Sequence, residues 1–154
     1  YEGNLFFVIR MPVDPSPNFT SEQLTLFFTP GVIITFQELT GGDCFHLVRE
    51  RLRKGKGKIR ERGVDYLAYA LIDAAIDSYF PALEKLSAAL ERLEDQIIVD
   101  PAPAVMTDLH EVKQELLAMR RSIWPMRDAL GSLIRSEYEF ISAETRIYLR
   151  DCAD

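Results

Sequence analysis

The first forty residues hold three short segments whose hydrophobic and polar positions predict β-strands. Residues 5–13 form a continuous apolar and β-branched run, whereas residues 23–29 and 32–38 alternate apolar with polar side chains. Between the last two segments, Thr-Pro-Gly at 29–31 has Pro and Gly in the order that favours a type II turn. We therefore expect these two strands to form a hairpin. Because three strands cannot cover both faces of a sheet, helices or further strands must pack on it.

A helical period replaces the strand pattern after residue 42. Asp43 is a candidate N-cap for a short helix at 44–54, which Gly55 would end. Two long heptad patterns follow, in which apolar residues recur at alternating steps of three and four. The first comprises Ile72, Ile76, Tyr79, Leu83, Leu86, Leu90, Leu93 and Ile97, and the second comprises Leu109, Val112, Leu116, Met119, Ile123, Met126, Leu130 and Leu133.

The two heptad patterns predict two long helices that pair as an antiparallel hairpin, because only the proline-containing segment 100–103 separates them. With some 30 residues at 1.5 Å per residue, each arm would be roughly 45 to 50 Å long. Pro81 and Pro125 each remove a backbone hydrogen bond, and because the heptads continue in phase across both, we expect bends rather than breaks. A third helix is predicted to begin near Ser142 and to continue to Asp154, as if the chain ended in mid-helix.

The charge distribution is uneven. The 154 residues carry a net charge of -6, yet residues 49–63 hold eight basic and two acidic side chains, a net +6 that leaves -12 for the remainder. A basic segment of this kind can bind nucleic acid or anionic lipid. We interpret it as a solvated helix end and loop, because basic side chains favour the last helical turn and Gly55 and Gly57 resemble helix stops. No nucleic-acid partner is predicted.

The sequence lacks the signatures of a membrane span, a disulfide framework or an active site. No apolar run approaches the roughly 18 to 20 residues of a membrane helix, so the chain as given is expected to be soluble. The two distant cysteines, Cys44 and Cys152, favour a reducing compartment. His46 and His110 have no second histidine at metal-ligand spacing, and no nucleophile stands in a recognisable setting. We predict that the chain is not an enzyme.

Three carboxylates, Asp65, Asp73 and Asp77, interrupt the otherwise apolar helical stretch DYLAYALIDAAIDSYF at 65–80. At 100° per residue they fan over about 120° of one side of the helix, next to the heptad positions. They can be solvated flank positions, with Asp65 near the helix N-terminus. They can also lie at a subunit contact, where a hard dication bridges like charges. The pattern itself does not choose between these interpretations.

Four blocks carry a resemblance that runs in order along essentially the whole chain. They are TFQE (35–38), VRERLRKGKGKIRERGVDYLAYALIDAAIDSYFPALEKL (48–86), IWPMRDAL (123–130) and ETRIYLRDCAD (144–154). These blocks resemble the cytosolic domain of the CorA family of pentameric divalent-cation channels. The resemblance implies an α+β fold in which a partial α/β/α domain with a short antiparallel sheet (1–62) precedes a long antiparallel helical hairpin of "willow" helices (63–135). Residues 136–154 would start the stalk helix that leads to a missing membrane region.

The resemblance also implies a function and candidate metal ligands. In the family, carboxylates of adjacent subunits hold Mg²⁺ and lock the pore shut when cytosolic Mg²⁺ is plentiful. Asp73 and Asp151 match acids of this site by their position in the motifs, and Asp77 is an additional candidate. The implied protein is a regulatory domain on the cytoplasmic face of the membrane, in a homopentamer, that senses Mg²⁺ or a cation such as Co²⁺, Ni²⁺ or Zn²⁺. One departure is Cys152-Ala153-Asp154, where the family often has Val-Tyr-Asp-His.

Two alternatives stay open at this point. Zinc-transporting relatives share the same layout, and no residue of this chain excludes them. A soluble helical adaptor could instead use the heptad positions to bind partner helices without any metal role. Such an adaptor would self-associate to the same extent with and without Mg²⁺.

Overall fold

The computed structural model describes residues 3–13, 18–39, 42–99 and 103–153. Strands β1 (Leu5–Pro12), β2 (Ser21–Phe28) and β3 (Ile33–Gln37) form one antiparallel sheet in that order. The helices that follow are α1 (His46–Lys54), the 3-10 helix η1 (Gly57–Arg60), α2 (Val64–Asp77), α3 (Phe80–Val99), α4 (Pro103–Arg135) and α5 (Ala143–Ala153). The predicted α+β fold is confirmed. Within the described residues, no helix is both long enough and apolar enough to cross a lipid bilayer.

The predicted hairpin between the second and third strands is confirmed, but the predicted turn type is wrong. Phe28 lies opposite Ile33, and the Thr29 N–H donates to the Val32 carbonyl oxygen at 2.9 Å. A type II turn needs a positive φ at its third residue. Gly31 occupies that position without a positive φ. The tripeptide therefore closes the hairpin through a different backbone conformation.

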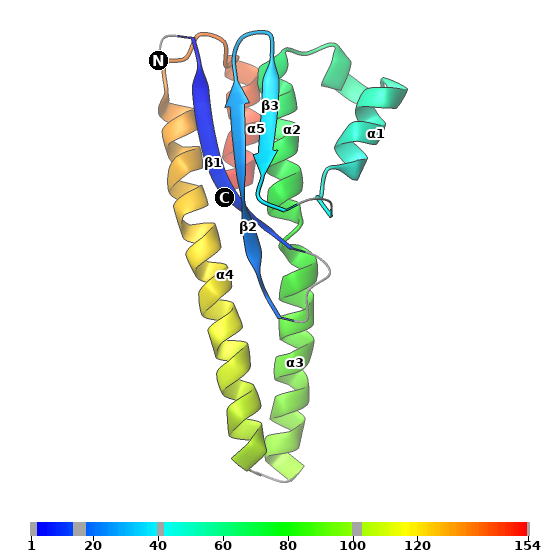
Figure 1. The fold of residues 1–154 in the computed structure, drawn as a ribbon, viewed down its shortest axis with the longest axis vertical. Helices are drawn as coiled ribbons and strands as arrows, with labels where there is room; N and C mark the ends of the chain where they lie inside the picture. Colours follow the sequence, from blue (N-terminus) through cyan, green and yellow to red (C-terminus); the bar gives the residue numbers. More distant parts are fainter. Residues whose placement is uncertain (1–2, 14–17, 40–41, 100–102, 154) are drawn as a thin grey trace.

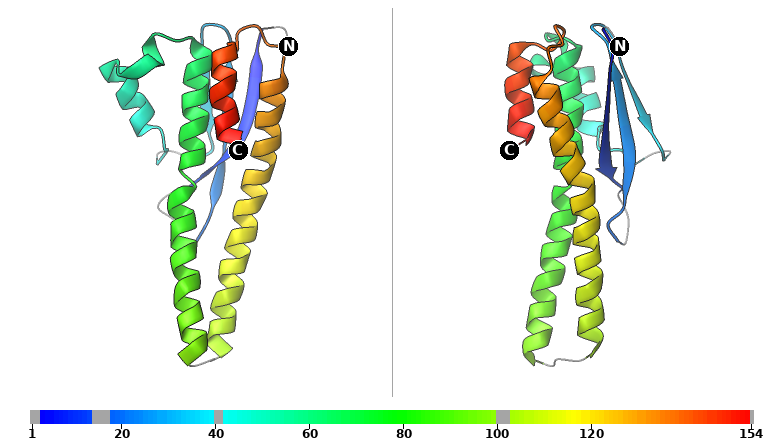
Figure 2. Two further views of the ribbon diagram at one scale, coloured as in Figure 1. Left: turned by 180° about the vertical axis from the view of Figure 1, so that it is seen from behind. Right: turned by 90° about the vertical axis from the view of Figure 1, so that its left-hand side faces the viewer.

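The helices cover one face of the sheet. Viewed from the side in Figure 2, the sheet, the pair formed by α2 and α4, and then α5 follow one another as three layers. Helix α4 packs along β1, and α5 packs against both α2 and α4. Helices α1 and η1 project to one side of α2 (Figure 1). The opposite face of the sheet leaves Phe6, Val8, Ile34 and Phe36 between 43% and 60% exposed.

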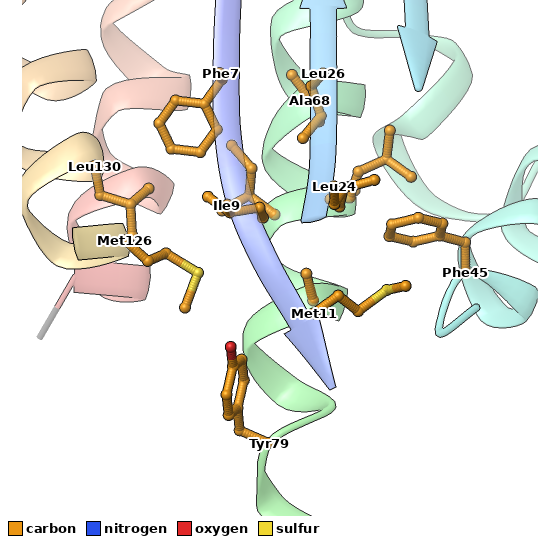
Figure 3. Packing of buried hydrophobic residues seen from close by; sticks show 14 of the residues in the cluster. Phe7, Ile9, Met11, Leu24, Leu26, Phe45, Ala68, Tyr79, Met126 and Leu130 are labelled. Carbon is orange, nitrogen blue, oxygen red and sulfur yellow. The ribbon is translucent and has the colours of Figure 1, made fainter. Parts of the chain in front are cut away.

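The core lies between the sheet and the helices. Alternate side chains of β1 and β2 point inward, as period-2 strands require. In Figure 3 they meet aromatic, thioether and aliphatic side chains from α2, α4 and the segments beside them. The buried residues labelled there are Phe7, Ile9, Met11, Leu24, Leu26, Phe45, Ala68, Tyr79, Met126 and Leu130.

Helices α3 and α4 extend away from this core as the predicted antiparallel hairpin (Figure 1). Buried residues recur every seven positions: Tyr79, Leu86 and Leu93 on the first arm, and Val105, Val112, Met119, Met126 and Leu133 on the second. The intervening heptad positions are less covered, since Leu83 is 39%, Ile97 41% and Leu116 37% exposed. The heptad prediction is thus only partly correct: one apolar position of each repeat is buried and the other is more exposed. The reason is that two helices packed on each other cover only a narrow strip of each helix surface.

The first arm differs from its prediction near Pro81. The expected continuous helix is two helices, because α2 ends at Asp77 and α3 begins at Phe80. The Ser78 hydroxyl donates to the Ala75 carbonyl at 2.6 Å, and the Tyr79 N–H turns to the Ile76 carbonyl at 3.0 Å. Pro81 has no N–H to offer the Asp77 carbonyl. The helix therefore breaks there, whereas α4 continues unbroken through Pro125.

The start of α1 also differs from its prediction, whereas its end does not. Phe45 occupies the N-cap position, and no side chain caps the helix. Asp43 instead accepts the Phe45 N–H at 3.0 Å and pairs with Arg49. Gly55 ends the helix in the left-handed conformation, with a φ of 60°, as a helix stop should.

Candidate functional site

Asp73 lies in the middle of α2, and the docking of α5 brings the end of the chain to it. The Cys152 thiol donates to Asp73 Oδ1 at 3.5 Å. One turn earlier on α2, the Tyr69 ring stacks on Tyr148 of α5, with ring centroids 5.1 Å apart. Packing between two helices distant in sequence therefore places Asp73 beside the residue that follows Asp151.

The surroundings of Asp73 disfavour its negative charge. Burial raises the pKa of this half-buried carboxyl, and the nearby charge of Asp77 raises it further. The Cys152 thiol, the Arg51 guanidinium and the Tyr69 hydroxyl act in the opposite direction without cancelling the rise in pKa. A cation near Asp73 would offset both unfavourable contributions.

Cys152 is a neutral thiol in this site. Burial raises its pKa to about 12, with further contributions from the charges of Asp73, Asp151 and Asp77. The protonated thiol serves as a hydrogen-bond donor to Asp73. The sequence reasoning missed this contact, since only the packing of α5 on α2 creates it. Tyr69 could have been found, because it stands four residues before Asp73 on one helix.

The three predicted ligands do not form a closed metal centre within one chain. Asp73 is half-buried, whereas Asp77 and Asp151 are exposed on α2 and α5. Across the described residues, no group of three or more His, Cys, Asp or Glu side chains converges as a metal site would. A cation bound here would therefore need ligands from water or from another chain.

Asp65 has a structural role that neither of the two interpretations of these acids predicted. It is 7% exposed, and its Oδ2 accepts the Ser142 N–H at 2.9 Å. Burial alone would raise the pKa of this carboxyl, but hydrogen bonds from Ser142, Thr145 and the Tyr66 backbone outweigh it and lower the pKa. Asp65 thus anchors the start of α5 to α2.

Several basic side chains of the segment 49–63 are engaged in contacts within the chain. Lys54 pairs with Glu50, and both Lys58 and Arg62 pair with Glu144 at the start of α5. Arg60 donates to the Leu52 and Arg53 carbonyls at the end of α1. These contacts agree with the interpretation of the segment as a helix end and loop.

Comparison with known proteins gives the family. A model of the CorA-like Mg²⁺ transporter protein family matches residues 1–154. The chain belongs to this family. A relative from Thermotoga maritima, "Cobalt/magnesium transport protein CorA", is 38% identical over 156 residues, which cover 100% of this chain and 44% of the relative. The chain thus spans less than half the length of this CorA protein.

Solved structures of the CorA family share the fold. The complete structure of the CorA magnesium transporter from Methanocaldococcus jannaschii matches 99% of this chain and 48% of its own, with a TM-score of 0.84 and 22% identity. The soluble domain of the same transporter also matches 99% of this chain, and 61% of its own, with a TM-score of 0.79 and 22% identity. At this identity the likeness shows the fold alone, including the sheet and the long helical hairpin.

Proposed function

We propose that this chain is the regulatory domain of a CorA-type magnesium channel, on the cytoplasmic face of the membrane. In this proposal it senses Mg²⁺ at contacts between identical subunits of a homopentamer and thereby gates the pore. Family membership supports the transporter class, and the 38% identical relative is named as a cobalt and magnesium transport protein. The proposed regulatory ligands are Asp73 and Asp151, with Asp77 as a further candidate.

The observation that carries the proposal is the state of Asp73. Its carboxyl is half-buried, its pKa is raised by burial and by Asp77, and the exposed Asp151 lies next to its hydrogen-bond donor Cys152. Acids held close together without a compensating ion lower the stability of the arrangement. Because one chain supplies too few converging ligands, a second subunit is the natural source of the others.

The donor set suits a hard dication. Mg²⁺ prefers oxygen ligands and keeps several of its waters, so a few carboxylates suffice to hold it. Asp73, Asp77 and Asp151 offer only oxygen, and the Cys152 thiol donates a hydrogen bond to Asp73. A bound cation would supply positive charge between the acids. Asp73, oriented by Cys152 and Tyr69, would then favour the closed subunit arrangement, and loss of the cation would favour separated subunits.

The remaining assignments follow from the same proposal. Residues 1–62 form part of an α/β/α domain, residues 63–135 the hairpin, and residues 136–154 the start of a stalk helix. The contacts of α5 with α2 and α4 would couple that stalk to the metal site. In this role the chain has no catalytic function, and it contacts the membrane only through segments outside residues 1–154.

Limited proteolysis of the full-length protein tests the proposal. Mg²⁺ is expected to slow cleavage of the wild type, and the double variant Asp73→Asn with Asp151→Asn is expected to lose this protection. Asp95→Asn with Asp108→Asn is the control, since it also removes two carboxylate charges, but from exposed positions on the hairpin. Unchanged protection in the Asp73 and Asp151 variant would remove these residues from the site.

Proteolysis with other metals and measurements of self-association distinguish the two alternatives, a zinc-transporting relative and a helical adaptor. Protection by Zn²⁺ at concentrations where Mg²⁺ has no effect would favour a zinc-transporting relative. Self-association that is identical with Mg²⁺ and with a chelator, measured by analytical ultracentrifugation, would favour an adaptor without a metal role.

A further inference from the structure

Both arms of the long helical structure carry the same short motif, Ser-x-x-Pro, at a break between two helices on the first arm and inside one continuous helix on the second. Ser78-Tyr79-Phe80-Pro81 spans the break between α2 and α3, and Ser122-Ile123-Trp124-Pro125 lies inside α4. In each motif the serine hydroxyl donates backward to a main-chain carbonyl, from Ser78 to Ala75 at 2.6 Å and from Ser122 to Ala118 at 3.2 Å. Serine bonds of this kind bend helices.

The proline three residues later removes a second support from each arm. Pro81 cannot donate to the Asp77 carbonyl, and Pro125 cannot donate to the Arg121 carbonyl. Each arm therefore has one stretch in which the helical hydrogen-bond ladder is interrupted or shared with a side chain. Sharp changes of helix direction concentrate at such stretches.

The end of the β1–β2 connection ties the two motifs to the sheet. On the first arm, the Tyr79 hydroxyl donates to the Arg10 carbonyl at 3.0 Å, and the Tyr79 ring lies 6.0 Å from the ring of Phe19. On the second arm, Glu115 Oε2 accepts the Phe19 N–H at 2.8 Å.

A third contact completes this arrangement. The hydroxyl oxygens of Ser21 and Ser122 lie 3.0 Å apart, and Ser122 is 5% exposed. Arg10 of β1, Phe19 of the β1–β2 connection and Ser21 of β2 thus contact the two arms at the level of the two motifs. Beyond this level α3 packs chiefly on α4 (Figure 1), so these contacts decide the angle between hairpin and sheet.

We propose that the two Ser-x-x-Pro motifs form a paired hinge, and that the contacts of Tyr79, Glu115 and Ser122 with the sheet form a clamp that holds it. Releasing the clamp lets the hairpin from residue 80 to residue 121 swing as one body, because its buried heptad layers lie on the far side of the hinge. The proposal holds whether or not the chain senses Mg²⁺, since no metal ligand takes part.

Distances between spin labels, measured by double electron–electron resonance, test the hinge in the 154-residue chain. One label is placed on β3 by Thr35→Cys and one near the far end of α3 by Glu94→Cys, both at exposed positions. Cys44 and Cys152 are replaced by alanine, and unlabelled chain in excess suppresses distances between molecules. The clamp variant combines Tyr79→Phe, Glu115→Ala and Ser122→Ala.

The clamp variant is expected to widen the distance distribution and shift its mean. Ser132→Ala is the matched control: Ser132 makes the same backward bond to the Asp128 carbonyl at 3.0 Å, but it is exposed and no proline follows three residues later. An unchanged distribution in the clamp variant, or equal widening in the control, would overturn the proposal.

If the clamp variant is not properly folded, as judged by the loss of cooperative unfolding, a second variant still tests the hinge. Pro81→Ala with Pro125→Ala restores both missing N–H donors and is expected to narrow the distribution. A distribution as wide as that of the parent would also overturn the hinge.

Discussion

Replacement of Asp65 should destabilise the chain far more than replacement of any other acid on α2. Asp65→Ala removes the buried carboxylate that accepts the Ser142 N–H and leaves that part-buried donor without its acceptor. Hydrogen bonds to a charged group contribute about 1.5 to 3 kcal/mol, and an unsatisfied buried donor costs about 1 to 3 kcal/mol. Because these two contributions overlap, we expect a loss of about 2 to 3 kcal/mol in the free energy of unfolding.

Urea denaturation followed by far-UV circular dichroism measures this loss near neutral pH. For a chain of this size, it corresponds to a fall of about 4 to 12 °C in the thermal midpoint. Asp77→Asn, on the same helix but exposed, is the control and should change stability by no more than about 0.5 kcal/mol. Equal effects of the two substitutions would refute the anchoring role of Asp65.

The pH dependence gives an independent check. The folded pKa of Asp65 is lowered, so its ionised form binds fewer protons than the unfolded chain does in the acid range. Its stabilisation is therefore present above the unfolded pKa of about 3.9 and is lost as the pH falls through the folded value. Asp65→Asn should remove this component, and a variant with the same acid sensitivity as wild type would contradict the assignment.

Three further predictions follow from burial and charge. Leu93→Ala, at a buried heptad position, should lower the free energy of unfolding by about 2 to 4 kcal/mol, whereas Leu83→Ala, at a position 39% exposed, should lower it by about 1 kcal/mol. Equal urea midpoints of the two variants would contradict the one-sided packing of the hairpin. Burial raises the pKa of Cys44 to about 11, so its alkylation by iodoacetamide in mildly alkaline buffer should be slower than in the urea-unfolded chain, as mass spectrometry can measure. Asp73 has a raised folded pKa, so ionisation of its carboxyl above about pH 3.9 lowers the stability of the folded chain. Asp73→Asn, measured in the presence of a chelator, should therefore raise the urea midpoint near neutral pH. A lower midpoint would contradict the idea that the ionised carboxyl destabilises this site.

The order of the elements was determined by the sequence. A continuous apolar and β-branched run located the first strand, period-2 alternation located the other two, and period-3.5 recurrence located the helical hairpin. These patterns follow from local backbone geometry. Gly55 marked the end of α1 for the same reason, since its left-handed conformation depends on the residue itself. The motif blocks also sufficed to identify the family.

The helix break needed more than the pattern of apolar residues. The heptad spacing of apolar residues continues across Pro81. The backbone conformation there depends instead on which N–H and hydroxyl groups bond to which main-chain carbonyls. The Ser78 hydroxyl and the Tyr79 N–H take acceptors that a continuous helix would use differently. Around Pro125, by contrast, the surrounding turns of α4 remain intact. The same residue type therefore gave two outcomes, according to its tertiary setting.

The surroundings of the carboxylates were decided only by the tertiary structure. Asp65, Asp73 and Asp77 look alike on a helical wheel, but α5 covers them unequally. Asp65 is buried under Ser142, Asp73 meets Cys152, and Asp77 stays exposed. The hydrogen bonds of Asp65 and Asp73 come from Ser142 and Cys152, which lie about 80 residues away in sequence. Local periodicity carries no information on that contact, which is why the sequence could place these acids on one side of a helix but could not tell which of them is buried.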